Sequence, residues 1–259
     1  MHELLRELTP SGRVLDLGAA AGSFDVSCTR GRVFRIDLEA RPAADGAARV
    51  IGDAARLPFA GRAFDAVVAN HSLEHVERLD DCLREIGRAV RPGGCLFVSV
   101  PDASTLTDRI YRWLARGGGH VNPFAADPAA LALRIAELTG LPFTAGRTLH
   151  TGLSFLNARN ARTPMPRRAI LFGGGREPVL RAITLALRRI DLWFGTRLSV
   201  YGWALYFGPV SDVDTTPLPN VCVRCGSAHD PPPGRAWACP GCGARNFRTG
   251  PIPSRDRFL

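Results

Sequence analysis

An α/β fold built on a mostly parallel sheet is the fold class that the sequence predicts, and three observations carry this prediction. Across the first hundred of the 259 residues, short apolar runs alternate with helical patterns, which is typical of βαβ units. A run of glycine and alanine (18–22) follows the first predicted strand, so the backbone there can approach a ligand closely. The second predicted strand ends on an acidic residue, Asp37.

The individual elements follow from the spacing of the apolar residues. Positions 79, 82, 83, 86 and 90 form one stripe of a helix, which the Arg-Pro-Gly-Gly run at 91–94 ends. We expect further helices at 130–138 and 178–193. We expect strands at 13–17, 33–38, 66–69, 94–100, 149–156 and 200–207.

Composition divides the chain into four parts. We expect a main domain at 1–210 with a basic substrate or cap region at 111–198, a linker at 211–220, a cysteine module at 221–247 and a disordered tail at 248–259. The N-terminus has no signal-peptide pattern, and the longest uncharged apolar stretch, 198–210, is shorter than the roughly 20 residues of a membrane-spanning helix. We therefore expect a cytoplasmic protein.

The positive charge is concentrated in the middle of the chain. All 33 basic residues are arginine, a bias that a GC-rich genome explains, and the formal net charge is +9. Residues 111–210 hold 13 of these arginines but only four acidic residues, whereas residues 1–110 are slightly acidic. We expect this basic segment to face something anionic.

Two aspartates predict a nucleoside pocket beside the glycine and alanine run. Asp37 lies 15 residues after Gly22, about where an acid meets the ribose hydroxyls of a nucleoside cofactor. Asp53 lies in a loop after a short apolar run and could accept a hydrogen bond from an adenine amino group. A nicotinamide-dependent dehydrogenase is disfavoured, because its Gly-x-Gly-x-x-Gly fingerprint is not met between Gly18 and Gly22.

Three stretches of the sequence resemble the class I S-adenosylmethionine-dependent methyltransferases of the methyltransferase-11 type: residues 14–24, 52–76 and 85–102. Two looser matches lie at 117–124 and 201–208. The resemblance implies a Rossmann-like, seven-stranded, mostly parallel sheet with an antiparallel last strand at 200–207. It also implies S-adenosylmethionine as the cofactor, held by Asp16, Gly18, Ala20 and Gly22 at the methionine end, Asp37 at the ribose, Asp53 and Ala54 at the adenine and Asn70 near the sulfonium.

The sequence departs from this family pattern in two places. Ala20 replaces the central glycine of the usual Gly-x-Gly-x-Gly run, which narrows the turn without closing it. The first strand begins about a dozen residues into the chain, so the helices that often cap this pocket are not expected. We expect residues 103–170 or a second subunit to exclude water from the pocket.

Methyl transfer depends mainly on alignment of the two reactants, so no particular catalytic residue is obligatory. If the acceptor is a weak acid, a general base is useful, and His71 and His75 follow a predicted strand end. His71 is the catalytic candidate because it follows Asn70 directly; the alternative is a capping or substrate-shaping role. We expect Glu74 to be structural, and His120 lies in a glycine-flanked loop from which it could reach the substrate.

Four cysteines near the C-terminus predict a zinc ribbon. Cys222 and Cys225 form one Cys-x-x-Cys pair, Cys239 and Cys242 form the second, and 13 residues separate the two pairs. Two such pairs deliver four thiolates to a tetrahedral Zn²⁺, and iron is the lesser alternative. We expect the remaining cysteines to be buried apolar residues: Cys28, Cys82 and Cys95.

These features leave several functions open. The leading hypothesis is a methyltransferase acting on a small or carrier-linked acceptor, and the basic middle segment favours an anionic one. The first alternative is an RNA methyltransferase that binds phosphates through its zinc ribbon and its arginine side chains, among them Arg224, Arg235, Arg245 and Arg248. The second is a non-catalytic docking protein with a retired cofactor pocket.

The arginine run from Arg159 to Arg197, beside Trp193 and Phe194, could also lie on an anionic membrane surface. A solvated helix face packed on the sheet is the preferred interpretation of this run. The acceptor and the oligomeric state are open.

Overall fold

The computed structural model describes residues 1–20, 22–39, 46–114, 121, 124, 127–150, 153–160, 167–211, 213–217, 222, 235–239, 243–247 and 252. Its main sheet contains β1 (Arg13–Leu17), β2 (Arg32–Asp37), β3 (Ala48–Ile51), β4 (Phe64–Asn70), β5 (Val90–Pro101), β6 (Phe143–His150) and β7 (Val200–Phe207). The helices are α1 (His2–Arg6), α2 (Leu79–Ala89), α3 (Leu106–Leu114), α4 (Pro128–Thr139) and α5 (Glu177–Phe194). Short 3₁₀ segments are η1 (Val26–Cys28), η2 (Leu73–His75), η3 (Ser154–Leu156), η4 (Ala158–Asn160) and η5 (Arg167–Gly175).

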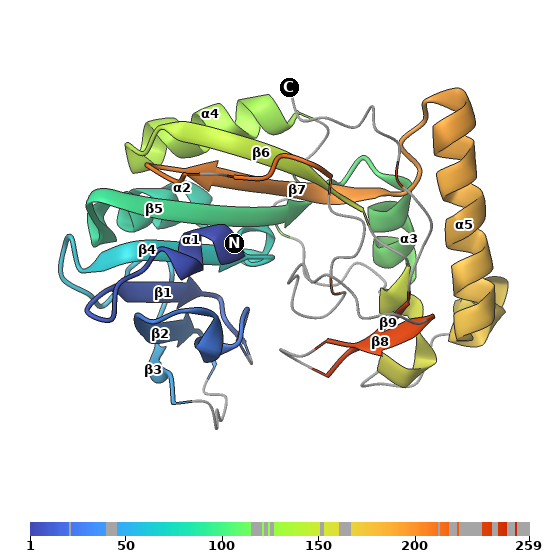
Figure 1. Cartoon of the computed structure of the whole chain (residues 1–259), viewed down its shortest axis with the longest axis horizontal. Coiled ribbons are helices and arrows are strands. Elements are labelled where there is room, and N and C mark those ends of the chain that lie inside the picture. The colour runs from blue at the N-terminus through green and yellow to red at the C-terminus, as the bar shows by residue number, and fades with distance from the viewer. Residues whose placement is uncertain are drawn as a thin grey trace.

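The seven strands lie in the order β3-β2-β1-β4-β5-β7-β6 (Figure 1). The five strands from β3 to β5 in this order run parallel to one another. Strand β7 runs antiparallel to both β5 and β6. The strand order reverses between β1 and β4, which is the switch point where open α/β sheets bind ligands. The predicted seven-stranded sheet with an antiparallel last strand is therefore confirmed.

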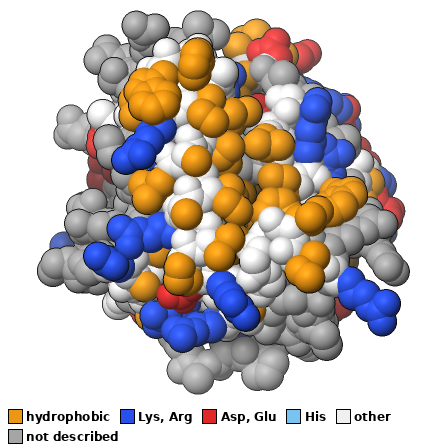
Figure 2. Space-filling view, turned by 90° about the vertical axis from the view of Figure 1, so that its right-hand side faces the viewer, with side chains coloured by type: hydrophobic (Ala, Val, Ile, Leu, Met, Phe, Trp, Pro, Cys, Tyr) orange, Lys and Arg blue, Asp and Glu red, His pale blue; other side chains and the backbone are white. Residues whose placement is uncertain are grey.

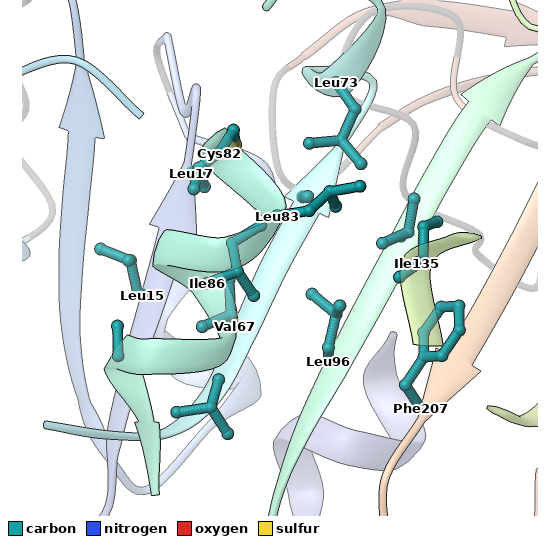
Figure 3. Packing of buried hydrophobic residues seen from close by; sticks show 14 of the residues in the cluster. Leu15, Leu17, Val67, Leu73, Cys82, Leu83, Ile86, Leu96, Ile135 and Phe207 are labelled. Atoms are coloured by element: carbon teal, nitrogen blue, oxygen red, sulfur yellow. The ribbon is translucent and has the colours of Figure 1, made fainter. Parts of the chain in front are cut away.

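Helix α2 covers one face of the sheet with the apolar stripe that its spacing predicted. Cys82, Leu83 and Ile86 are fully buried and point onto the strands in Figure 3. Ile135 of α4 joins the same core cluster. On the other face, Leu4 and Leu5 of α1 pack in a second cluster that includes Phe97 and Tyr206.

Two predicted boundaries were wrong. The strand expected at 149–156 is β6 at Phe143–His150, and residues 154–156 form η3 instead. The sequence obscures β6 because Arg147 lies in it; this arginine is buried and donates to the Glu3 carboxylate at 2.9 Å. The strand expected at 94–100 begins at Val90, so the Arg-Pro-Gly-Gly run lies inside β5 rather than in a turn.

Helix α3 was not predicted from the sequence. Leu106, Ile110, Trp113 and Leu114 recur at helical spacing, so an amphipathic pattern is present in the sequence and was overlooked. The buried residues of α3 are Thr107, Asp108 and Leu114. Asp108 is held by the guanidinium of Arg112, at 2.6 Å on the same helix.

The described part of the cysteine module forms a separate two-stranded sheet of β8 (Ala236–Ala238) and β9 (Arg245–Phe247). Phe247 packs in one cluster with Leu114 of α3 and Leu180 of α5, so β9 lies against the helices that follow the main sheet. Of the predicted tail at 248–259, only Ile252 belongs to the described residues. Within the described chain, no helix combines the length and apolar character needed to cross a bilayer.

Candidate functional site

The carboxyl ends of β3, β2, β1 and β4 bring the predicted cofactor residues to one edge of the sheet. Asp37 pairs with Ile51 across β2 and β3, and Leu17 pairs with Ile36 across β1 and β2. Asn70 ends β4, the neighbour of β1 on the other side. Strand register alone therefore places these residues around the turn that follows β1.

Close packing of the turn after β1 requires glycine at position 18. Gly18 has a φ of +66°, and its N–H donates to the Ile36 carbonyl at 2.9 Å. A Cβ at this position would lie 2.5 Å from the Ser72 Cβ, so a side chain would push the turn away from the loop after β4.

Ala20, which stands in place of the usual central glycine, has a left-handed backbone conformation with a φ of +46°. Such a conformation costs a non-glycine residue roughly 1–2 kcal/mol. Two contacts hold it there: the Ala20 N–H donates to Asp37 Oδ2 at 2.7 Å, and Arg49 Nη1 donates to the Ala20 carbonyl at 2.9 Å. Asp37 thus links the end of β2 to the turn after β1.

A buried ion pair lies directly beneath this turn. Asp16 and Arg35 are 0% and 2% exposed, with Arg35 Nε at 3.3 Å from Asp16 Oδ2. The same carboxylate oxygen accepts from the Ser23 N–H at 2.9 Å, and Arg35 Nη2 donates to the Phe24 carbonyl at 2.8 Å. A Cβ at Gly22 would lie 2.6 Å from the guanidinium, so the ion pair itself requires that glycine.

The second oxygen of Asp16 is a buried acceptor that receives no hydrogen bond from the described residues. Burial raises the pKa of Asp16, and the Ser23 hydroxyl, the Ser23 N–H and the Arg35 guanidinium oppose that change. Asp16 was predicted from the sequence as a site residue, whereas Arg35 was not. The sequence offered one signal for Arg35, namely a charged residue among the apolar residues Val33, Phe34 and Ile36 of the predicted strand.

Asp53 follows β3 and is held by two donors. Its Oδ1 accepts from the Ala55 N–H at 2.8 Å, and its Oδ2 accepts from Arg78 Nη2 at 2.6 Å. The Ala55 N–H and, next, the Arg78 guanidinium lower the pKa of the Asp53 carboxyl. Ala54 is partly buried beside it, and the sequence analysis missed Arg78.

Two exposed apolar side chains flank Asp37 and were also missed. Leu38 follows Asp37 directly and is 73% exposed. Ile51, which pairs with Asp37 across β2 and β3, is 65% exposed. The sequence showed only that an apolar residue stands at or next to the end of each of these two strands. Together they supply an apolar surface beside the carboxylate.

The end of β4 carries the predicted catalytic histidine. Asn70 Oδ1 accepts from Ser99 Oγ at 2.5 Å, and the His71 N–H donates to the Ser99 carbonyl at 3.0 Å. His71 has a φ of +51°, and its Nδ1 lies 3.7 Å from Glu74 Oε1. Its ring centroid is 5.2 Å from that of Tyr201.

Both imidazole nitrogens of His71 are buried and accept or donate no hydrogen bond among the described residues. Glu74 is buried beside it, and burial together with this carboxylate raises the pKa of Tyr201. His75 is exposed, and His120 lies outside the described residues. His71 is therefore the histidine that sits in a buried polar cluster at the strand end.

Backbone contacts bring parts of the segment after β5 back over this edge. The Val121 N–H donates to the Glu74 carbonyl at 2.9 Å, and the Ala103 N–H donates to the Phe124 carbonyl at 2.6 Å. That residues 103–170 exclude water from the pocket stays a prediction.

Two of the four predicted zinc ligands lie together. Cys222 and Cys239 are buried in one small cluster with Trp237 and Ala244. The Gly243 N–H donates to the Cys239 carbonyl and the Cys239 N–H to the Ala244 carbonyl, both at 2.8 Å, which closes a tight turn. Cys225 and Cys242 lie outside the described residues, and no group of three metal ligands occurs among the residues that are described.

Two expectations about cysteine and arginine side chains need correction. Cys82 is fully buried, as expected, and burial raises the pKa of its thiol to about 12, but Cys28 and Cys95 are only partly buried. Arg188, expected in the exposed arginine run, is 1% exposed. Burial lowers its pKa to about 10, and the Asp191 carboxylate opposes that change.

Comparison with known proteins agrees with the geometry of this edge. A family model described as "Methyltransferase domain" (Methyltransf_11) matches residues 15–98, which contain the turn after β1 and most of β5. Malonyl-[acyl-carrier protein] O-methyltransferase of Methylococcus capsulatus is 33% identical over 186 residues, covering 62% of this chain and 67% of that protein.

More distant matches share the fold or a shorter segment. Demethylmenaquinone methyltransferase of Mycolicibacterium vanbaalenii is 39% identical over 111 residues, and the chain spans only 48% of that relative's length. A structure of geranyl diphosphate methyltransferase in complex with SAM has a TM-score of 0.52 at 16% identity, covering 81% of this chain and 82% of that one. The family model and the Methylococcus relative place this chain in the methyltransferase-11 family of S-adenosylmethionine-dependent methyltransferases.

Proposed function

We propose that this methyltransferase holds S-adenosylmethionine at the carboxyl edge of β1, β2 and β4 and methylates a small or carrier-linked acceptor with an anionic group. The observation that carries the proposal is the hydrogen bond from Ala20 to Asp37, which joins the glycine-rich turn to the acid that would bind the ribose. This link keeps the turn in its ligand-binding shape although its central residue is alanine.

The residues at this edge fit each part of the cofactor. The Asp37 carboxylate accepts only two hydrogen bonds from the described protein, from the N–H groups of Ala20 and Glu39. A carboxylate has room for about four, so the ribose hydroxyls would take the remaining positions. Leu38 and Ile51 would contact the adenine faces, with Asp53 and Ala54 at its edge.

The methionine end would lie over the turn formed by Gly18, Ala20 and Gly22. The Asp16 oxygen that receives no hydrogen bond from the described residues lies beneath this turn and would accept from the cofactor's ammonium group. Asn70, at the end of the next strand, would line the sulfonium region.

When bound, S-adenosylmethionine supplies an electrophilic methyl group on a sulfonium sulfur. The protein's part is to hold the acceptor in line with that methyl group and to exclude water. We propose that His71 takes the proton from the acceptor, because its imidazole nitrogens have no hydrogen bond among the described residues and Glu74 lies beside it. A capping role has less support, since Ser72 is the N-cap residue of η2.

The choice of acceptor class rests on the relatives and on charge. The relatives' names give a carrier-linked malonyl group and demethylmenaquinone as acceptors. The arginine excess at 111–210 would favour an acceptor with an anionic group. No specific observation favours RNA, and Arg245 contacts the Glu177 carboxylate rather than standing free for phosphate. Membership of the methyltransferase family removes support for a purely docking role.

We also propose that Cys222, Cys225, Cys239 and Cys242 bind one Zn²⁺. Support comes from the clustering of Cys222 with Cys239 and from Asn246 Nδ2, which lies 3.6 Å from Cys222 Sγ as a donor. Phe247 and Arg245 of β9 pack on α5 and η3, so the metal would stabilise the far end of the substrate region rather than take part in catalysis.

The first prediction concerns cofactor affinity. Asp37→Asn weakens binding of S-adenosylhomocysteine by about tenfold or more, because hydrogen bonds to a charged acceptor contribute about 1.5–3 kcal/mol. Leu38→Ser weakens binding by a smaller factor through lost apolar contact. Isothermal titration calorimetry measures both effects.

Matched variants control for nonspecific damage. Glu137→Gln changes an exposed carboxylate at the end of α4, and Leu133→Ser changes a leucine that is 71% exposed, close to the 73% of Leu38. Both controls bind like the native protein. Unchanged affinity in Asp37→Asn, with circular dichroism showing a native fold, would remove Asp37 from the site.

The second prediction concerns the acceptor. Labelled methyl groups pass from S-adenosylmethionine to malonyl-acyl-carrier protein or to demethylmenaquinone. His71→Asn lowers this turnover by about 10²–10⁴-fold while cofactor affinity stays within about twofold. His75→Asn, at the exposed neighbouring histidine, keeps native turnover. Methylation of tRNA alone, or full turnover by His71→Asn, would contradict the proposal.

The third prediction concerns the metal. Elemental analysis of purified protein finds about one zinc per chain, and Cys222→Ser or Cys239→Ser loses it whereas Cys28→Ser keeps it. Because metal binding is coupled to folding, a chelator lowers the melting temperature of the native protein by about 5 °C or more. Stoichiometric iron, or a metal content that the Cys222 and Cys239 substitutions leave unchanged, refutes the zinc ribbon.

A further inference from the structure

Helix α5 carries large apolar side chains on its outer side as well as on its inner side. Its buried residues are Leu180, Thr184, Arg188 and Asp191, three of which are polar. Its exposed residues include Val179, Leu192, Trp193 and Phe194, and the last two are more than 70% exposed. A helix on a protein surface ordinarily buries its apolar side, so an apolar outer side indicates that something else covers it.

The inner side of α5 packs Leu180, Ile183 and Leu187 in an apolar cluster, and hydrogen bonds also fix its C-terminal end. Asp191 Oδ1 accepts from the Leu198 N–H at 2.7 Å, and Asp191 Oδ2 accepts from the Ser199 N–H at 2.8 Å. These bonds hold the end of α5 against the start of β7. The orientation of the helix is therefore determined by apolar packing and buried polar contacts together.

The apolar surface continues beyond α5. Ile170 and Leu171 of η5 are 77% and 71% exposed, and η5 contacts α5. Figure 2 looks at this side of the molecule and shows hydrophobic side chains running down the face with arginines at its borders. We call this surface the α5 face and define it by Ile170, Leu171, Val179, Leu192, Trp193 and Phe194.

The charge around the α5 face is positive. Arg176, Arg189 and Arg197 are exposed, and none of them forms an ion pair with an acidic residue in the described part of the chain. Between residues 167 and 211 the acidic residues are Glu177 and Asp191, of which Asp191 is buried and Glu177 contacts Arg245. Arg197 lies over the Trp203 ring, 4.7 Å from its centroid, but has no carboxylate partner among the described residues. An apolar surface bordered by cations that no described carboxylate neutralises matches an anionic, partly apolar partner.

We propose that the α5 face binds the surface of an anionic lipid bilayer. Trp193 and Phe194 would enter the boundary between headgroups and acyl chains, where aromatic side chains are favoured, and the arginines would contact lipid phosphates. A second copy of this chain fits less well. A two-fold contact would bring two surfaces with positively charged borders together, because each partner of such a contact presents the same surface.

This surface is connected to the acceptor side of the site. Helix α5 is bonded to the residues just before β7, and Tyr201 of β7 lies beside His71. A membrane-bound α5 face would therefore bring the strand end that carries His71 near the bilayer. The inference stands without any particular acceptor, since it rests on the outer side of α5 alone.

Vesicle flotation with the full-length protein tests the proposal. The native protein floats with vesicles of one part phosphatidylglycerol to one part phosphatidylcholine and binds pure phosphatidylcholine at least about tenfold more weakly. Trp193→Ser combined with Phe194→Ser lowers binding to the mixed vesicles by about tenfold or more. Arg176→Glu combined with Arg189→Glu lowers binding to the mixed vesicles by a similar factor. The residual binding of this variant no longer depends on the salt concentration.

Leu133→Ser is the matched control, because Leu133 is as exposed as the residues of the α5 face but lies on α4, at the opposite end of the molecule in Figure 1. This variant floats like the native protein. Failure of the native protein to float, or undiminished flotation of the Trp193 and Phe194 variant, overturns the proposal. So does a stable dimer in sedimentation velocity that the same two substitutions dissociate, because a second copy would then cover the face.

Discussion

The buried ion pair between Asp16 and Arg35 is the constraint on which the candidate site depends. Both side chains are almost completely removed from water, so each charge needs the other, and losing one partner of such a pair costs about 3–5 kcal/mol. The pair fixes Ser23 and Phe24 beneath the turn after β1 and leaves no room for a side chain at Gly22. The shape of the turn is thus set by the protein before any cofactor binds.

Further hydrogen bonds fix the residues above this ion pair, at the carboxyl edge of the sheet. The Ala20 N–H reaches Asp37, Arg49 reaches the Ala20 carbonyl, and Arg78 reaches Asp53. Prearranged donors and acceptors of this kind reduce the ordering cost of binding. They also explain how the chain tolerates alanine where the family usually has the central glycine.

Local sequence patterns revealed the elements and strand ends of the first hundred residues. The α2 stripe, the glycine and alanine run and the acid at position 37 are all visible within a few residues of sequence, and the structure has β1 and β7 at the predicted bounds. Arg35, Arg78 and Ile51 were missed because their roles depend on which strands and loops become neighbours. Strand register makes Ile51 the partner of Asp37, and no local pattern contains that register.

The second half of the chain was harder to interpret for the same reason. The spacing predicted α5 to within one residue at each end, but it could not say which side faces inward, since apolar residues occur on both sides. The orientation is decided in part by Asp191, whose hydrogen bonds lie across a turn at the start of β7. In β6, the buried Arg147 hid the strand because its partner Glu3 lies at the other end of the chain.

The central claim is that the turn after β1 and the ends of β2 and β4 form one preformed cofactor site. Hydrogen–deuterium exchange with and without S-adenosylhomocysteine tests it most directly. The account predicts slower exchange on binding in peptides that contain residues 18–24, 37–39 and 70–74, with β8 and β9 unchanged. Protection confined to other parts of the chain, with these three peptides unaffected, would contradict it.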